Sequence, residues 1–157
     1  MKTILFVCTG NLCRSPMAEG LLRRKLEQEG LLKEYRVRSA GVCAVEGAPA
    51  SPDAVRVMAE RGVDISGHRA HDLTAADVEE AALILTMTPS HAESIRREFP
   101  RQARKVYTLA EMAGRSYGVD DPYGGSLAEY RRCADEIERL IEEGYRRILR
   151  LAGRASP

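Results

Sequence analysis

The chain has 157 residues, of which 24 are basic and 23 acidic, for a formal net charge of +1, and 44% of its residues are hydrophobic. This length and balance are typical of one globular domain with its own core, and they exclude the strongly basic surface of a nucleic-acid-binding protein. No run approaches the roughly 20 apolar residues of a membrane span, and the apolar start is too short for a secretory signal, so we expect a cytoplasmic protein that binds neither nucleic acid nor membrane.

The first half of the chain alternates predicted strands and helices. Apolar, β-forming residues over 2–8 predict a buried strand of a parallel sheet. A helix is expected over 16–29, because Pro16 suits a first helical turn and Gly30 suits a helix end. A short strand follows at 35–39, and a second helix runs from Ser51 to near Gly62.

The second half continues the alternation. A helix opens at Thr74, where Thr74 and Asp77 form a capping pattern, and it is followed by a strand at 82–85, a helix at 89–98 and a strand at 105–108. A loop over 114–125 leads to the last helix, from Ser126 to about residue 151. The alternation predicts one α/β domain around a central parallel sheet, spanning residues 1–152, with residues 153–157 as a frayed tail.

The four cysteines do not form a metal-binding pattern. In a cytoplasmic protein they are expected to be reduced. The pair Cys8 and Cys13 lacks the second cysteine pair or the spaced histidines that are typical of zinc sites, and Cys43 and Cys133 are isolated. We therefore predict no metal site and no cofactor.

The segment from Val7 to Pro16 carries the chemistry, because it joins the first predicted strand to the first predicted helix. In a parallel sheet this loop lies at the edge where ligands bind. Gly10 and Asn11 tolerate the positive φ of a tightly curled loop. Such a loop turns its N–H groups inward and, with the helix N-terminus, binds an anion. The expected phosphate-binding residues are Thr9, Gly10, Asn11, Leu12, Cys13, Arg14 and Ser15.

Within this loop, Cys8 is the expected nucleophile, because a helix N-terminus and a nearby arginine favour the thiolate. Arg14 can hold two phosphate oxygens with its planar guanidinium, and Ser15 can donate a hydrogen bond to the sulfur. The loop has no Gly-Lys-Ser/Thr of a nucleotide-binding P-loop. The alternative is a buried cysteine beside a surface arginine, but C-x5-R-S in this setting favours transfer of a phosphoryl group to Cys8.

Such a transfer is easier when an acid protonates the leaving group. Asp121 is the candidate, because Pro122 holds it in extended geometry and stiffens its loop. Alone, this Asp-Pro pair would indicate only a turn before the helix at Ser126. Beside the cysteine loop we favour Asp121 as general acid, with Asp120 as the alternative.

Four segments resemble the low-molecular-weight protein phosphatase family, and the resemblance covers almost the whole chain. The family pattern V-C-x-G-N-x-C-R-S-P-x-A-E matches residues 7–19, R-S-A-G matches residues 38–41, D-I-S-x-H matches residues 64–68, and D-P matches residues 121–122. The resemblance implies a flavodoxin-like α/β three-layer sandwich with a four-stranded parallel sheet. It also implies hydrolysis of phosphorylated protein side chains through a phosphocysteine intermediate, with inorganic phosphate or vanadate as active-site ligands.

The resemblance also implies roles for individual residues. Cys8 is the implied nucleophile, Arg14 the phosphate binder and Asp121 the general acid. Ser39 and His68 are implied to support the loop through hydrogen bonds with Asn11. Taken alone, His68 would be interpreted as a surface histidine.

The features that separate two branches of the family give mixed signals. Tyrosine-directed members carry an aliphatic residue where this chain has Leu12, and arginine-directed members tend to carry threonine. Gly124 and Gly125 after the pocket residue Tyr123, and the threonines of the segment 86–88, lean toward phosphoarginine. We favour phosphotyrosine, because leucine would desolvate a guanidinium without offering it a partner, and protein arginine phosphatase is the alternative.

Two other functions and one regulatory step stay open. Arsenate reductase shares this fold and loop but needs further cysteines near the third strand, and residues 75–95 hold none. A phosphate-binding module without turnover would need no acid, yet Asp121 is present. Under peroxide, Cys13 is either a resolving thiol for Cys8 or a small packing residue.

Overall fold

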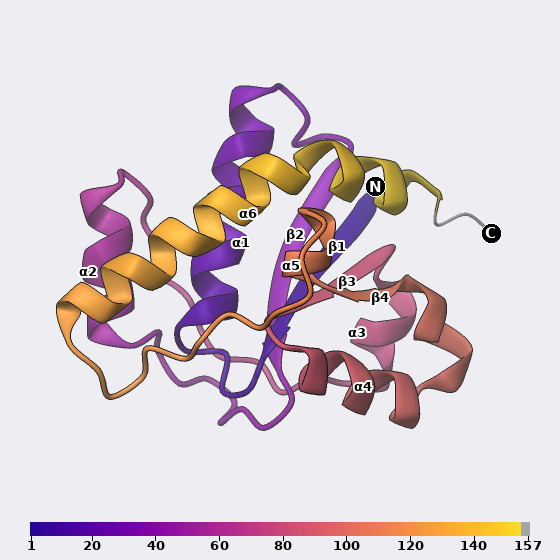
Figure 1. Cartoon of the computed structure of the whole chain (residues 1–157), viewed down its shortest axis with the longest axis horizontal. Coiled ribbons are helices and arrows are strands. Elements are labelled where there is room, and N and C mark those ends of the chain that lie inside the picture. Colours follow the sequence, from indigo (N-terminus) through magenta and orange to yellow (C-terminus); the bar gives the residue numbers. More distant parts are fainter. Residues whose placement is uncertain (155–157) are drawn as a thin grey trace.

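The computed structural model describes residues 1–154, and its centre is a four-stranded parallel sheet. The strands lie in the order β2-β1-β3-β4 (Figure 1). Their bounds are Lys2–Cys8 for β1, Tyr35–Gly41 for β2, Leu83–Thr86 for β3 and Val106–Thr108 for β4. This confirms the predicted α/β class and the four-stranded parallel sheet.

Helices cover both faces of the sheet and make three layers (Figure 1). Ile4 and Phe6 of β1 face one layer, while Leu5 and Val7 face the other, as the two-residue period of a strand requires. The first layer holds α1 (Arg14–Gln28), α2 (Pro52–Glu60), α5 (Leu109–Met112) and α6 (Leu127–Arg154). The second holds α3 (Ala75–Glu80) and α4 (Pro89–Glu98), and the 3₁₀ helix η1 (Pro100–Lys105) leads from α4 to β4.

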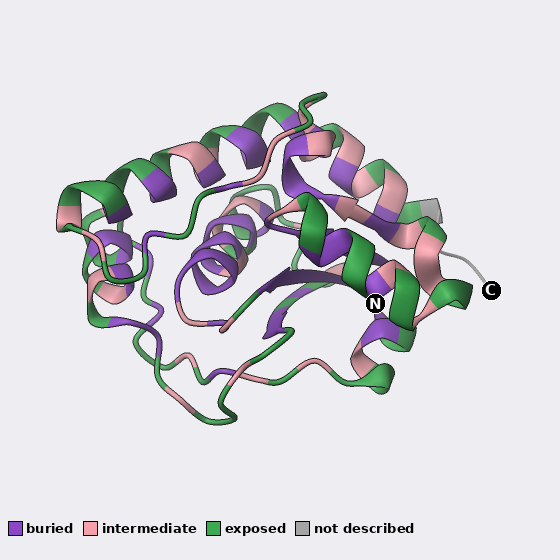
Figure 2. Ribbon diagram, turned by 60° about the horizontal axis from the view of Figure 1, so that its bottom comes forward, coloured by how far each residue is buried: buried purple, intermediate pink, exposed green. Residues whose placement is uncertain are grey.

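The inner surfaces of these layers are buried, and the outward faces of the helices are exposed (Figure 2). β1 is flanked by β2 and β3, so its residues are covered from both faces and both sides. Six of its seven residues are buried, which explains why the strand is a nearly continuous apolar run. A central buried strand gives a rigid base to the loop that follows Cys8.

Most of the predicted elements are present, with shifts at their ends. The helix α4 has the predicted bounds, and the capping box at Thr74 and Asp77 forms. The first helix begins at Arg14, two residues early, and η1 and α5 were not predicted because each is too short for a clear periodicity. The last helix continues to Arg154, two residues into the predicted tail, with Ala152 fully buried; the rest of that tail prediction, residues 155–157, lies outside the described residues.

The end of β2 lies against the loop after β1. A Cβ placed on Gly41 would lie 2.5 Å from the Thr9 carbonyl oxygen, a distance that no side chain can occupy without moving the backbone. The absence of a side chain at Gly41 therefore lets β2 approach the loop closely.

Within residues 1–154, no helix combines the length and apolar character needed to cross a lipid bilayer.

Candidate active site

The loop of residues 8–15 turns its carbonyl oxygens outward. Four of them accept hydrogen bonds from outside the loop, at 2.8–3.0 Å: those of Cys8 from Val42 N, Thr9 from Cys43 N, Asn11 from His68 Nε2, and Leu12 from Ser51 N. In a trans peptide the C=O and N–H groups point in opposite directions. The N–H groups that follow these carbonyls therefore point into the loop, which makes it an anion-binding nest.

Asn11 is the hub that holds this curl. It is fully buried and adopts a φ of 58°, a left-handed conformation that asparagine tolerates better than most residues. Its side-chain oxygen accepts from the His71 N–H (2.9 Å), and its side-chain nitrogen donates to Ser15 Oγ (2.8 Å) and Ser39 Oγ (3.0 Å). Both functional groups of the amide are thus used.

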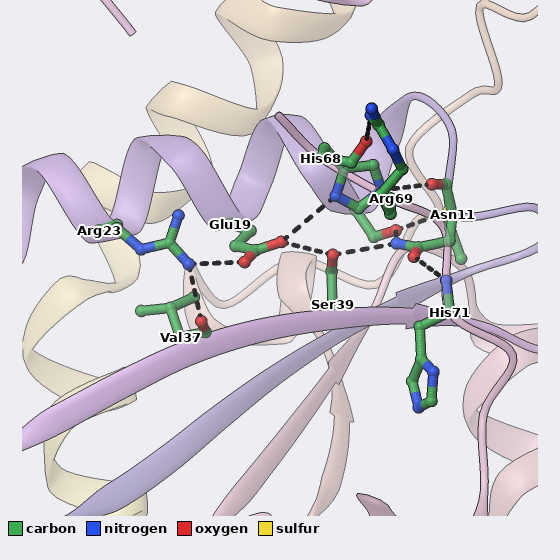
Figure 3. Close-up of polar contacts among 10 residues, drawn as sticks. Asn11, Glu19, Arg23, Val37, Ser39, His68, Arg69 and His71 are labelled. Carbon is green, nitrogen blue, oxygen red and sulfur yellow. Dashed lines mark hydrogen bonds and ion pairs between the residues drawn. The ribbon is translucent and has the colours of Figure 1, made fainter. Parts of the chain in front are cut away.

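The Asn11 side-chain nitrogen determines the direction of the hydrogen bonds that the Ser15 and Ser39 hydroxyls make. An amide nitrogen only donates, so Ser15 accepts from Asn11 and has its own proton for Cys8 Sγ, 2.9 Å away. Ser39 likewise accepts from Asn11 and donates to Glu19 Oε1 at 2.5 Å. Figure 3 shows the outer part of this network, from Asn11 through Ser39 to Glu19. Arg23 closes its outer end on Glu19 at 2.6 Å. A single ordered chain of hydrogen bonds therefore runs from the surface to the Cys8 sulfur.

Arg14 is held from the far side of the loop. Its side chain is only 5% exposed, its Nη1 donates to the Val119 carbonyl (2.9 Å), and its Nη2 lies 3.5 Å from Asp121 Oδ2. Val119 is itself anchored, because its N–H donates to the Met87 carbonyl at 2.8 Å. The guanidinium is thereby fixed in orientation at the edge of the anion nest.

A pocket of about 200 Å³ opens over the loop. The Asp121 side chain is 48% exposed and Tyr123 is 65% exposed, so one wall of the pocket is open to solvent. Asp121 Oδ1 also accepts from the Tyr123 N–H at 3.1 Å, which links the two residues. The pocket is lined by Cys8, Thr9, Gly10, Leu12, Cys13, Arg14, Asp121 and Tyr123.

A second support comes from α4. His91 Nε2 lies 2.9 Å from Thr9 Oγ1, and His91 is buried. Burial, with the positive charge of Arg14 as a smaller cause, lowers the pKa of His91 to about 4, so the ring is neutral near pH 7. A neutral imidazole adds no charge beside Arg14.

Cys13 differs from Cys8 in its surroundings. Its sulfur lies 3.2 Å from Ser51 Oγ and 3.4 Å from the Tyr130 hydroxyl, and burial raises its pKa. Cys13 is therefore a thiol near neutral pH and packs between the loop and α6. All four cysteines are free, and burial also raises the pKa of Cys133, to about 12.

The arrangement suits a doubly charged anion held by backbone N–H groups and one guanidinium, next to a sulfur. Among the described residues, no group of three or more histidine, cysteine, aspartate or glutamate side chains is placed to hold a metal ion.

The chain matches the family model described as low molecular weight phosphotyrosine protein phosphatase over residues 3–150. The chain belongs to this phosphatase family.

Similar proteins carry names of several kinds, among them protein-arginine-phosphatase, low molecular weight protein-tyrosine-phosphatase and arsenate reductase. A protein of Bacillus subtilis named protein-arginine-phosphatase is 44% identical over 141 residues, covering 89% of this chain and 92% of that one. A probable low molecular weight protein-tyrosine-phosphatase of Ralstonia nicotianae is 40% identical over 148 residues, covering 94% and 97%. The crystal structure of a low molecular weight protein tyrosine phosphatase from T. tengcongensis superimposes with a TM-score of 0.88 at 44% identity, covering 94% and 99%.

In this phosphatase, the residues singled out from the sequence lie together. Cys8, Arg14 and Asp121 line one pocket with the predicted pocket residues Leu12 and Tyr123. Ser39 and His68 both contact Asn11, Ser39 at its side-chain amide and His68 at its backbone carbonyl.

Sequence reasoning missed three contacts of the loop: His91 on Thr9, the Val119 carbonyl on Arg14, and Tyr130 on Cys13. The sequence around His91 predicts only a charged, amphipathic helix. The one signal for a role of His91 in the site is its position shortly after the carboxyl end of the third strand.

Proposed function

We propose that this chain is a cysteine-dependent protein phosphatase that works through a phosphocysteine intermediate. The observation that carries the proposal is the Cys8 sulfur, which accepts a hydrogen bond from the Ser15 hydroxyl at the mouth of an anion nest closed by Arg14. The nest and the guanidinium would stabilise the negative charge that builds up on the transferring group.

The proposed reaction has two steps. The Cys8 thiolate attacks phosphorus, an S–P bond forms and the P–O bond to the substrate breaks, while protonated Asp121 gives its proton to the leaving oxygen. Water then attacks the phosphocysteine, Asp121 takes a proton from that water, and the S–P bond breaks to release inorganic phosphate and the thiolate. Asp121 is suited to both steps because it lines the pocket from an exposed loop that water can reach.

We infer phosphotyrosine as the favoured substrate. Leu12 and Tyr123 give the pocket two apolar surfaces next to the phosphate loop, which favours an aromatic ring over a guanidinium. Two sequence features that favour phosphoarginine have structural explanations. Thr86 is fully buried and donates a hydrogen bond to the Thr88 carbonyl. Gly124 adopts a φ of 81°, which its turn requires. Phosphoarginine is the second candidate, supported by the name of the relative that is 44% identical.

The deciding experiment compares matched phosphotyrosine and phosphoarginine peptides in the presence of a chelator. We expect both to be hydrolysed without metal, with the higher kcat/KM for phosphotyrosine, and we expect Cys8→Ser to lose turnover while still folding. Residual activity of Cys8→Ser within tenfold of wild type would contradict the mechanism. Faster hydrolysis of phosphoarginine would reverse the order of substrates and leave the mechanism in place.

We also propose a cytoplasmic location, inorganic phosphate and vanadate as ligands of the loop, and phosphorylated proteins as partners. The free thiols support the location, because Cys8 must stay reduced to act as nucleophile. The inward N–H groups and Arg14 support the ligands, since tetrahedral oxyanions match both.

A further inference from the structure

The phosphate loop also has a polar contact with α4. Thr9 directly follows Cys8 and lines the pocket, and its Oγ1 lies 2.9 Å from His91 Nε2 of α4. His91 itself is only 8% exposed. The backbone carbonyl of Thr9 is already used, because it accepts from Cys43 N. The hydroxyl is therefore the polar group of Thr9 whose direction remains to be set.

The surroundings of His91 decide which ring nitrogen carries the proton. Its Nδ1 is buried and has no hydrogen-bond partner within residues 1–154. A proton on Nδ1 would be a buried donor with nothing to receive it, a type of group that native proteins rarely contain. The proton therefore belongs on Nε2, which faces Thr9. Burial and Arg14 keep the ring neutral and so keep the second proton off Nδ1.

This tautomer sets the direction of the contact. Nε2–H donates to Thr9 Oγ1, so the hydroxyl cannot use its own proton on His91. The only proton of the hydroxyl is then available to a group in the pocket. Without His91, the same hydroxyl would rotate among several acceptors.

We propose that His91 is a positioning residue that makes the Thr9 hydroxyl a fixed donor to an oxygen of the bound phosphoryl group. This inference rests on the proposed function of the site. It adds one side-chain donor to the backbone N–H groups and Arg14. Because the supporting ring is neutral, the gain comes from direction and not from a further positive charge.

Phosphate affinity tests the proposal independently of turnover. Calorimetric titration with inorganic phosphate would compare wild type with Thr9→Val, His91→Leu and the double variant. A hydrogen bond to a charged acceptor corresponds to a loss of about 10- to 100-fold in affinity, and we expect that loss in each single variant. The double variant should bind no more weakly than Thr9→Val, since His91 acts only through the hydroxyl.

Two further variants separate positioning from folding. His91→Gln keeps an N–H donor at a similar reach and should recover most of the affinity that His91→Leu loses. Glu93→Gln, an exposed change on the same helix, is the matched control and should bind phosphate as wild type does. An additive loss in the double variant, or a His91→Gln variant as weak as His91→Leu, would overturn the proposal.

The tautomer can be measured without any substitution. ¹⁵N chemical shifts of the wild-type protein should show His91 protonated at Nε2 and bare at Nδ1 at pH 7, and the reverse pattern would overturn the proposal. Wild-type activity on phosphopeptides tests the proposed function separately. A protein that hydrolyses them but binds phosphate equally well with Thr9→Val would refute this inference alone.

Discussion

The two loops that meet at the pocket are built in opposite ways. The loop of residues 8–15 is mostly buried, and hydrogen bonds from several parts of the chain fix its backbone and side chains. The loop of residues 114–126 is mostly exposed, and it is anchored near its middle at Val119. Its functional side chains, Asp121 and Tyr123, lie at the open wall of the pocket.

From this difference we expect the two loops to serve different functions. Binding of the phosphoryl group depends on groups that must be in place before the ligand arrives, so these groups belong to a rigid, buried loop. Proton transfer and contact with the rest of the substrate need access to water and to varied side chains, so these belong to an open loop. Substitutions in the two loops should therefore differ in their effects on rate and stability.

Within the open loop, the largest effect on rate is expected from Asp121→Asn. Loss of a general acid should lower kcat by about 10²–10⁴-fold, with the greatest loss for poor leaving groups, while the free energy of unfolding should change by no more than about 0.5 kcal/mol because the site is exposed. Steady-state kinetics on aryl phosphates of graded leaving-group pKa would measure it. Equal losses for good and poor leaving groups would show that Asp121 is not the acid, and Asp120→Asn is the control.

Asn11→Ala should affect both rate and stability. It leaves Ser15, Ser39 and the His71 N–H without their partner and puts alanine at a φ of 58°, so we expect a loss of about 2–4 kcal/mol in unfolding free energy. A displaced loop should also lower kcat/KM by about 100-fold. Denaturant titration and kinetics would measure these. Asn11→Gly allows the positive φ but removes the amide, so it should recover only the backbone part of the lost stability.

Leu12→Thr tests which of the two loops selects the substrate, because Leu12 belongs to the phosphate loop, lines the pocket and also packs against the core. Threonine removes apolar surface and adds a hydroxyl, so we expect the ratio of kcat/KM for phosphotyrosine to that for phosphoarginine to fall by about tenfold. Competition assays with both peptides would measure the ratio. An unchanged ratio would show that the open loop, and not residue 12, selects the substrate.

The last expected effect is a pH dependence of the free energy of unfolding. The pKa of His91 is lowered to about 4 in the folded protein, so between about pH 4 and 6.5 the unfolded chain binds more protons at this residue. Its contribution is therefore complete above pH 6.5 and is lost as the pH falls toward 4, at up to about 1.4 kcal/mol per pH unit. Denaturant titrations across this range should give a shallower decline for His91→Gln than for wild type.

His71 provides the opposite case and so a control. A hydrogen bond to Glu46 is the main cause that raises the pKa of His71, so its contribution is present below about pH 6.5 and is lost as the pH rises through the raised pKa. His71→Gln should therefore lower the free energy of unfolding by a constant amount below pH 6.5 and remove the decline that wild type shows as the pH rises through the raised pKa. The same change of slope between pH 4 and 6.5 in both variants would contradict the assignment to His91.

The sequence predicts the phosphate loop better than its surroundings. Cys8, Asn11 and Arg14 lie within seven residues, and the loop between a buried strand and a helix is a local pattern that one stretch of sequence contains. Ser39 and His68 came only from the family resemblance, because nothing near them in the sequence indicates a contact with Asn11.

The contacts that were missed join distant parts of the chain. His91 is 82 residues from Thr9, and Tyr130 is 117 residues from Cys13. In the sequence each is an ordinary helix residue, because its contact with the loop depends on how the sheet places its helix. Likewise, α5 has four residues, about one helical turn, which is too short for an apolar period to show.

The anchoring of Arg14 on Val119 has a consequence for how the protein is made. These residues are 105 positions apart, and a ribosome adds about 5–20 residues per second, so about 5 to 20 s pass between their synthesis. During that interval the nascent chain carries Cys8 and Arg14 without the carbonyl that orients the guanidinium. The segment that holds the proposed nucleophile is thus translated first, and its arginine is oriented only when the last third of the polypeptide has emerged.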